Sequence, residues 1–168
     1  MKLLVIRHAV AMDRDEFAES GESDDLRPLT DDGAREMKRV AKGLRAEIGN
    51  IDVLVTSPLR RAMQTARIVG KAYRMKVSRT TDALLPDANP DELEKLCAEI
   101  GVKDTIAVVG HEPHLSHLVT WLMVGGRDSR IRMRKGGACL LEFESLPRRE
   151  SGTLGWLLTR GQLRRLGR

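Results

Sequence analysis

The sequence predicts an α/β fold in three layers: a mostly parallel β-sheet flanked by helices on both faces, with a C-terminal hairpin. Three short apolar runs, at residues 2–7, 51–56 and 105–109, are typical of strands buried on both sides. Amphipathic segments with helical spacing separate these runs, and strands that alternate with helices form parallel sheets. Two further apolar segments, at 138–143 and 154–158, are joined by a turn-rich stretch and predict the hairpin.

The first strand is followed by a long segment without helical or strand periodicity, residues 9–28. Within it, Asp13 to Asp25 contains seven acidic residues and a single Arg. Long loops in compact domains are uncommon and are often functional or mobile. We therefore expect Asp13–Asp25 to be poorly ordered without substrate and to repel acidic partners from one side.

Helix start signals mark the segments between the strands. Thr30 is predicted to cap a helix that extends to Ile48, because two aspartates follow it where the helix dipole favours negative charge. Ser57 is predicted to cap the next helix, with Pro58 at its first position, where a missing N–H costs nothing. Further helices are predicted over 89–100 and 113–123, with a short strand over 77–80.

Length and charge limit the function classes. The 168 residues suit one domain, which we expect to span 1–160, followed by a basic tail over 161–168. The net charge is +5, and the excess lies in residues 127–168, where 11 basic residues accompany 4 acidic ones. A solvated surface is the commonest explanation of such a region. Five aromatic residues are too few for base-stacking platforms, so we expect no nucleic-acid partner.

Membrane, secretory and disulfide-stabilised classes are not expected. No apolar run approaches the ~18 residues of a membrane span, and the run after Met1 is too short for a secretory signal. Cys97 and Cys139 are far apart and form no CxxC motif, which argues against a disulfide framework or a zinc knuckle. We therefore expect a cytoplasmic protein.

Chemically active residues follow the predicted strands. Arg7 and His8 end the first strand, Ser57 follows the second with Arg61 in the next helical turn, and His111 follows the later strand. Because the carboxyl ends of parallel strands meet at one edge of a sheet, we expect these side chains to converge. Arginine forks and the free N–H groups of helix starts bind phosphate oxygens. The pattern therefore predicts an anion site.

The run from His111 to His117 also resembles a metal site, but its spacing argues against one. The metalloprotease pattern requires a His four residues after the first, where Leu115 stands. Pro113 begins the helix and leaves His111 outside it. We expect no metal ligands here; His114 would lie at the pocket rim, and His117 on the surface or at a helix contact.

These motifs resemble the signatures of the histidine phosphatase superfamily, which includes the cofactor-dependent phosphoglycerate mutases. Residues 26–30 and 85–90 make the resemblance closest to the short bacterial SixA-type phosphohistidine phosphatases. The likeness extends from Met1 to about Leu122 and implies a phosphoglycerate mutase-like fold. Arg7-His8-Ala9 is similar to the Arg-His-Gly signature, Ser57–Thr65 to the Ser-x-x-x-Arg-Ala-x-x-Thr segment, and Gly110-His111 to the second Gly-His.

The resemblance implies a phosphatase that uses no metal or other cofactor. His8 would attack phosphorus as a neutral imidazole, with its other ring nitrogen bonded to a backbone carbonyl. The product would be a phosphohistidine intermediate that water hydrolyses. Arg7, Arg61 and His111 would hold the phosphoryl oxygens, and Arg27 would complete the pocket.

Three positions need separate treatment. Ala9 replaces the usual Gly and adds a methyl group where the backbone could approach the substrate. Larger relatives carry a Glu acid in the middle segment; the nearest counterpart is Asp87, which is alternatively a turn residue. Arg60 is expected to point to solvent. The candidate substrate-binding residues are Arg27, Ser57 and Asp87.

The favoured substrate is a phosphorylated His on a protein. Only residues 76–104 separate the second helix from the later strand, which leaves little room for a cap that would enclose a small substrate. One alternative is a phosphomonoesterase for a small phosphate ester, such as a sugar phosphate or nucleotide. The other is a non-catalytic phosphate-binding regulatory module, with the arginines of 127–135 contacting an acidic partner.

Overall fold

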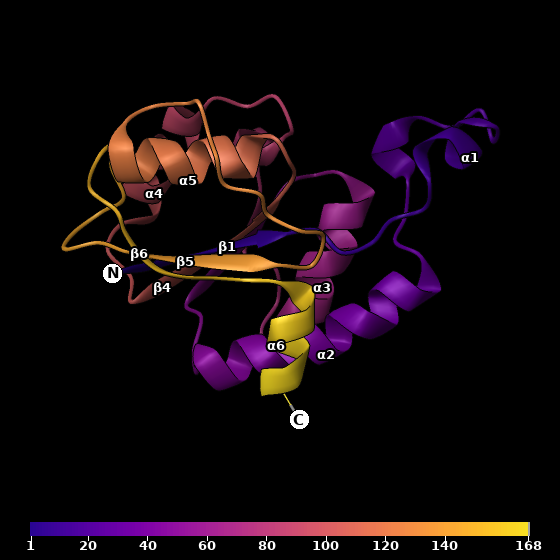
Figure 1. The fold of residues 1–168 in the computed structure, drawn as a ribbon, viewed down its shortest axis with the longest axis horizontal. Coiled ribbons are helices and arrows are strands. Elements are labelled where there is room, and N and C mark those ends of the chain that lie inside the picture. Colours follow the sequence, from indigo (N-terminus) through magenta and orange to yellow (C-terminus); the bar gives the residue numbers. More distant parts are fainter. Residues whose placement is uncertain (168) are drawn as a thin grey trace.

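A six-stranded sheet forms the centre of the protein, in a computed structural model that describes residues 1–167 (Figure 1). The strand order is β3-β2-β4-β1-β5-β6. Strands β3, β2, β4 and β1 are parallel, whereas β5 is antiparallel to both β1 and β6. The predicted, mostly parallel sheet with a C-terminal hairpin is therefore confirmed. The strands are β1 (Lys2–Arg7), β2 (Val53–Thr56), β3 (Arg79–Thr80), β4 (Thr105–Gly110), β5 (Ala138–Glu142) and β6 (Thr153–Leu158).

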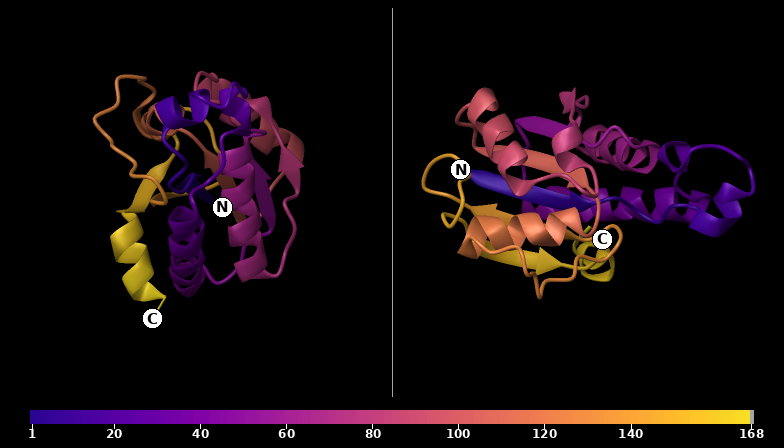
Figure 2. Two further views of the ribbon diagram at one scale, coloured as in Figure 1. Left: turned by 90° about the vertical axis from the view of Figure 1, so that its right-hand side faces the viewer. Right: turned by 90° about the horizontal axis from the view of Figure 1, so that it is seen from above.

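Helices cover both faces of this sheet, as Figures 1 and 2 show. The side chains of β1 alternate between two cores: Leu4 and Ile6 pack with α2, α3 and α6, whereas Leu3 and Val5 pack with α4 and α5. The predicted three layers are thus confirmed. No helix within residues 1–167 is long and apolar enough to cross a bilayer. The helices are α1 (Arg14–Ala18), α2 (Asp31–Glu47), α3 (Arg60–Tyr73), α4 (Pro90–Ile100), α5 (His114–Val124) and α6 (Arg160–Leu166), with 3₁₀ turns η1 (Asp24–Leu26) and η2 (Asp82–Leu84).

The acidic segment after β1 is folded, in contrast to the poor order expected for it. Helix α1 and turn η1 form within it, and the segment projects beyond the carboxyl end of β1 (Figures 1 and 2). Asp13 caps α1 by accepting hydrogen bonds from Asp15 N and Glu16 N, and Phe17 is buried. A helix of 5 residues is too short to show periodicity in a sequence, which explains why no pattern revealed it.

The C-terminal residues pack against α2 instead of forming the basic tail predicted for 161–168. Leu163 is fully buried, and Glu36 of α2 accepts ion-pair contacts from Arg160 and Arg164 at 2.8 and 2.7 Å. The two backbones approach closely because α2 has Gly43 here: a Cβ atom at this position would lie 1.8 Å from Leu163 O. Arg168, the last residue of the predicted tail, lies outside the described residues.

Candidate active site

The two histidines expected at the strand ends lie side by side. Strands β1 and β4 are neighbours in a register that pairs Arg7 with Gly110, and His8 N donates to Gly110 O at 3.1 Å. His8 and His111 therefore leave the sheet at the same level. Their ring centroids are 5.0 Å apart, so the convergence predicted from the sequence is present in the fold.

His8 is held in the protonation state that a nucleophile needs. Its ring is buried, and its Nδ1 lies 2.7 Å from Ala9 O. A carbonyl oxygen only accepts hydrogen bonds, so Nδ1 carries the proton and Nε2 keeps its lone pair. Burial lowers the pKa of His8 to about 3, and the nearby charges of Arg61 and Arg7 lower it further against the opposing Ala9 bond. The ring is thus neutral at physiological pH.

His111 is oriented by Ser57. Its Nε2 lies 2.9 Å from Ser57 Oγ, and its Nδ1 is buried without a hydrogen-bond partner in residues 1–167. Burial, and secondarily the neighbouring His8, lowers the pKa of His111 to about 2. The predicted role of Ser57 as a helix N-cap is wrong, because α3 begins only at Arg60. The serine follows β2 directly and contacts the imidazole instead.

Two buried arginines are fixed in the pocket by Asp24, a residue that the sequence analysis did not single out. Arg61 donates to Asp24 O at 2.9 Å, and Arg27 Nε donates to Asp24 Oδ1 at 2.7 Å. Burial opposes ionisation of this carboxyl, but the Arg27 bond and the Arg61 charge prevail and lower its pKa. Arg60 is exposed and Arg61 is buried, as predicted.

These groups surround a cavity of about 300 Å³ at the carboxyl edge of the sheet. Arg7 completes the cluster: its Nη1 donates to Met133 O at 2.7 Å, and its buried Nε has no protein partner within the described chain. The guanidinium groups of Arg7, Arg27 and Arg61, together with two imidazoles, suit a tetrahedral oxyanion. The lining residues are Arg7, His8, Met12, Asp13, Arg14, Arg27, Arg61, Pro86, His111, Glu112 and Lys135.

Lys135 and Glu112 line this pocket although the sequence analysis assigned them no role. Strand β5 is antiparallel to β1, so the residues before β5 lie where β1 ends. Gly136, with a φ of 71° that favours glycine, donates to the carbonyls of Arg7 and His8 and so places Lys135 at the site. Recognising that the C-terminal hairpin adds to β1 in the antiparallel sense would have identified it.

Asp87 and His114 do not lie where the sequence analysis placed them. Asp87 is exposed and outside the pocket lining, to which its neighbour Pro86 contributes. The assignment of Asp87 as an acid therefore has no geometric support, and the alternative of a turn residue holds. His114 is buried rather than at the rim, and burial lowers the pKa of its ring.

Ala9 is accommodated without strain. Among the described residues outside glycine, only Arg74 and Glu150 have a positive φ, so position 9 does not require glycine. The side chain of Ala9 is buried in the core beneath α2 and α3, and its N donates to Thr65 Oγ1 at 3.0 Å. The extra methyl group is thus directed into the core, outside the pocket lining.

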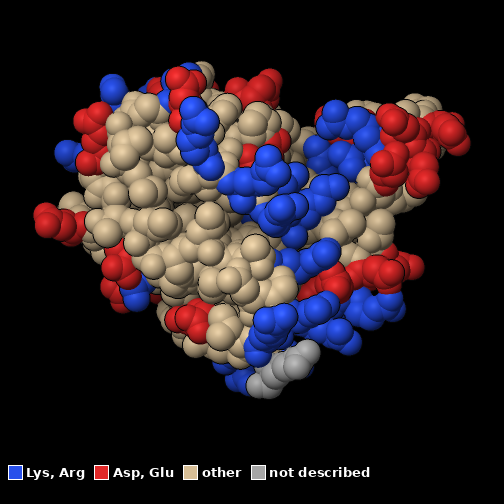
Figure 3. Space-filling view, in the orientation of Figure 1, with Lys and Arg blue, Asp and Glu red and all other residues tan. Residues whose placement is uncertain are grey.

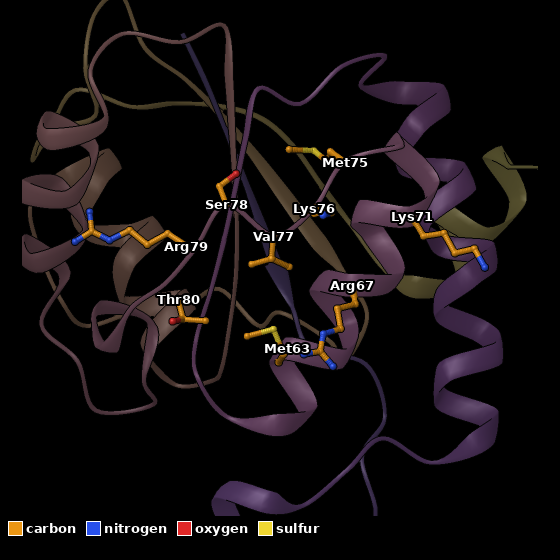
Figure 4. A pocket seen from close by; sticks show the side chains of 9 residues that line it. All are labelled: Met63, Arg67, Lys71, Met75, Lys76, Val77, Ser78, Arg79 and Thr80. Carbon is orange, nitrogen blue, oxygen red and sulfur yellow. The ribbon is translucent and has the colours of Figure 1, made fainter.

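A larger cavity, about 680 Å³, lies between α3 and residues 75–80 at the edge of the sheet (Figure 4). It has basic side chains but no imidazole. Figure 4 shows Arg79 and Lys71 pointing away from each other, and Arg79 pairs with Glu99 at 2.9 Å. Its cations therefore do not converge on one anion, in contrast to those around His8.

Known proteins share sequence and fold with this chain. Residues 3–104 match the histidine phosphatase superfamily (branch 1). An uncharacterized protein of Picosynechococcus sp. is 31% identical over 141 residues, which cover 82% of each chain. Phosphohistidine phosphatase SixA of Escherichia coli (strain K12) is 27% identical over 137 residues, covering 74% of this chain and 76% of that protein. The solved structure of the protein histidine phosphatase SixA complexed with tungstate matches with a TM-score of 0.78 and 24% identity, covering 97% and 99% of the two chains.

Proposed function

The chain belongs to the histidine phosphatase superfamily and is a phosphatase; we propose that it hydrolyses phosphohistidine on a cytoplasmic protein, through a phosphoryl group held covalently on His8. The observation that carries this proposal is the state of His8. Its ring is neutral, its Nδ1 is hydrogen-bonded to Ala9 O, and its Nε2 is free in a pocket lined by several guanidinium groups. A nucleophile and an oxyanion site in one pocket support catalysis rather than phosphate binding alone.

In the proposed first step, His8 Nε2 attacks phosphorus and the bond from phosphorus to the leaving nitrogen breaks. The leaving imidazole departs as a neutral ring when its other nitrogen carries a proton. Attack places a positive charge on the His8 ring, and Ala9 O, 2.7 Å from Nδ1, stabilises that charge. In the second step, water attacks phosphorus and the bond to Nε2 breaks, which restores the neutral ring.

The cationic groups hold the phosphoryl oxygens during both steps. Arg7, Arg61 and His111 would contact these oxygens, and Arg27 would stabilise the pocket's outer side. The unpartnered Nε of Arg7 is a donor that a phosphoryl group can satisfy, and the unpartnered Nδ1 of His111 is a second donor when Ser57 Oγ donates to Nε2 of that ring. Each charge-assisted bond contributes about 1.5–3 kcal/mol. Because the charge is distributed over three oxygens, several donors act together in the transition state.

Little of the chain lies over the pocket, and an open pocket supports a protein substrate. The chain between α3 and β4, where a cap over a small substrate would be inserted, forms only β3, η2 and α4. From this stretch only Pro86 lines the pocket. The similarity to the Escherichia coli phosphohistidine phosphatase is in accord with this substrate.

The test compares turnover of a phosphohistidine protein, an aryl phosphate and a panel of sugar phosphates and nucleotides. His8→Ala should abolish turnover of all of them, and His117→Ala, a change on α5 outside the pocket lining, should leave it unchanged. Rapid quenching should trap phosphate on the wild-type protein in a base-stable form that the His8 variant lacks. Full activity of His8→Ala would refute the covalent mechanism, and a strong preference for a sugar phosphate would refute the substrate.

A further inference from the structure

A second cationic cavity adjoins the catalytic pocket. Its volume is about 510 Å³, and it shares Arg7 and Lys135 with the pocket around His8. Arg134 adds a guanidinium group without an ion-pair partner among the described residues, Arg160 adds one that pairs with Glu36, and Val10 adds an apolar wall. A substrate that places its phosphoryl group on His8 would therefore extend over further positive charges on this side.

The loop before β5 continues this positive surface. Arg130, Arg132 and Arg134 are exposed, whereas Ile131 between them is half-buried and Met133 is buried. This alternation places the three guanidinium groups, which we name the arginine row, on the outer side of the loop. None of the three forms an ion pair within residues 1–167.

The opposite side of the pocket mouth carries negative charge. Figure 3 shows Lys and Arg gathered over the loop before β5, and Asp and Glu gathered on the projecting α1 segment. The α1 segment includes Asp15, Glu16 and Glu19, all exposed. A nucleic acid, negative along its whole length, would be repelled there. A protein surface can carry acidic residues only on the side that faces the arginine row. Such a surface is attracted to the positive side of the pocket mouth without being repelled by the negative side.

We propose that the second cavity and the arginine row bind acidic side chains of the protein substrate while its phosphohistidine occupies the catalytic pocket. This proposal rests on the proposed function. The positive charges already oppose one another: burial and the charges of Arg7, Arg27 and Arg61 lower the pKa of Lys135. Substrate carboxylates would relieve that repulsion and guide the substrate into a single orientation.

The test reverses two charges of the arginine row, in Arg132→Glu with Arg134→Glu. The matched control, Arg148→Glu with Arg149→Glu, makes the same change in the β5–β6 connection. This connection lies far from the pocket, because Glu142 at the end of β5 pairs with Lys2 at the start of β1, whereas the pocket lies where β1 ends. At low salt, kcat/KM for a phosphohistidine protein with an acidic surface should fall tenfold or more in the first pair. It should change less than about twofold in the control, and p-nitrophenyl phosphate turnover should be unchanged in both.

Equal effects of the two pairs, or none, would overturn the acidic-partner proposal while leaving the phosphatase function intact. Tighter binding of a labelled oligonucleotide than of the acidic protein, lost in the first pair, would also overturn it in favour of nucleic acid. Absence of phosphohistidine turnover by the wild type would remove the proposed function and this inference together.

A second, independent observation concerns Glu112, which follows His111 and lines the catalytic pocket. Its Oε2 accepts a hydrogen bond from Ser116 Oγ at 2.5 Å, which fixes the carboxylate against the first turn of α5. Its Oε1 is buried and has no hydrogen-bond donor among the described residues. An unsatisfied buried carboxylate oxygen is costly, and the negative charge of Glu112 acts on Arg7 in the same pocket.

We infer that Glu112 is the general base for the second step. Its carboxylate would take a proton from water as the water oxygen forms its bond to phosphorus and the bond from phosphorus to His8 Nε2 breaks. The products are hydrogen phosphate and a neutral His8, and Glu112 then releases the proton to solvent. This catalytic residue acts on water, so the first step does not need it when the leaving group is a good one.

Glu112→Gln keeps the shape of the side chain but removes the base. With p-nitrophenyl phosphate, this variant should release one nitrophenol per enzyme in a burst and then turn over about 10²–10⁴-fold more slowly than wild type, with phosphate trapped on His8. Glu92→Gln, the matched control, makes the same change at an exposed position of α4 outside the pocket lining and should show no such accumulation. Full turnover of Glu112→Gln, or slow turnover without a burst, would overturn this role. Wild type that never carries phosphate on His8 would instead refute the covalent mechanism.

Discussion

Lowering the pH from 7 to 5 is expected to destabilise the protein, because the rings of His8 and His111 stay neutral in the folded state. The pKa of His8 lies at about 3 and that of His111 at about 2, against about 6.5 in an unfolded chain. Below pH 6.5 both imidazole rings are therefore protonated in the unfolded state, whereas in the folded state they stay neutral until the pH is far lower. The stabilising contribution is complete above pH 6.5 and is lost as pH falls toward the folded-state pKa values.

The size of this effect follows from the same values. A pH of 5 is about 1.5 units below the pKa of about 6.5 that a histidine has in an unfolded chain. Protonation of the unfolded state at this pH therefore lowers the free energy of unfolding by roughly 2 kcal/mol for each buried histidine. His8 and His111 together would cost roughly 4 kcal/mol, a large part of a typical stability of about 5–15 kcal/mol. The lowered pKa of Asp24 acts in the same direction, but its contribution is lost only below about pH 4, where free aspartate titrates.

Urea unfolding at pH 7 and pH 5 measures the loss directly. The wild type should lose several kcal/mol in its free energy of unfolding, and the double variant His8→Asn with His111→Asn should lose much less. His117→Asn, on α5 outside the pocket, is the control and should behave as wild type. If the double variant loses as much stability as the wild type between these pH values, the buried neutral rings are not the cause.

Three further predictions follow from particular contacts. Arg61→Ala should reduce kcat/KM by about 10- to 150-fold, the equivalent of one charge-assisted bond of 1.5–3 kcal/mol, whereas the exposed Arg60→Ala should change it less than about twofold. Vanadate at a hundred times its Kd should raise the free energy of unfolding by about 2.7 kcal/mol, measured by urea unfolding; no stabilisation would contradict an oxyanion site. Gly43→Ala should destabilise the protein by about 1–3 kcal/mol, because its Cβ would meet Leu163 O at 1.8 Å. The matched Gly49→Ala has nothing within 4 Å and should be nearly neutral; equal melting temperatures for the two would contradict the close packing of α6.

The sequence alone determined the sheet and the central part of the site. Apolar runs and helical stripes identify β1, β4 and the larger helices, and the parallel arrangement places every strand's carboxyl end at one edge. His8 and His111 therefore had to converge, since each directly follows a strand. Arg61 was distinguishable from Arg60 because the resemblance to the superfamily's motif fixed the spacing from Ser57.

Only the tertiary structure decided which other groups join them. Lys135 reaches the pocket because β5 runs antiparallel to β1 and starts where β1 ends. Asp24 binds Arg27 three residues along the chain, and it reaches Arg61 of α3 across the fold. Asp87 was a reasonable acid by sequence position, yet it is exposed outside the pocket. The physical reason is common to all three: periodicity records which side of an element is buried, whereas the direction of a loop side chain depends on the packing of distant segments around it.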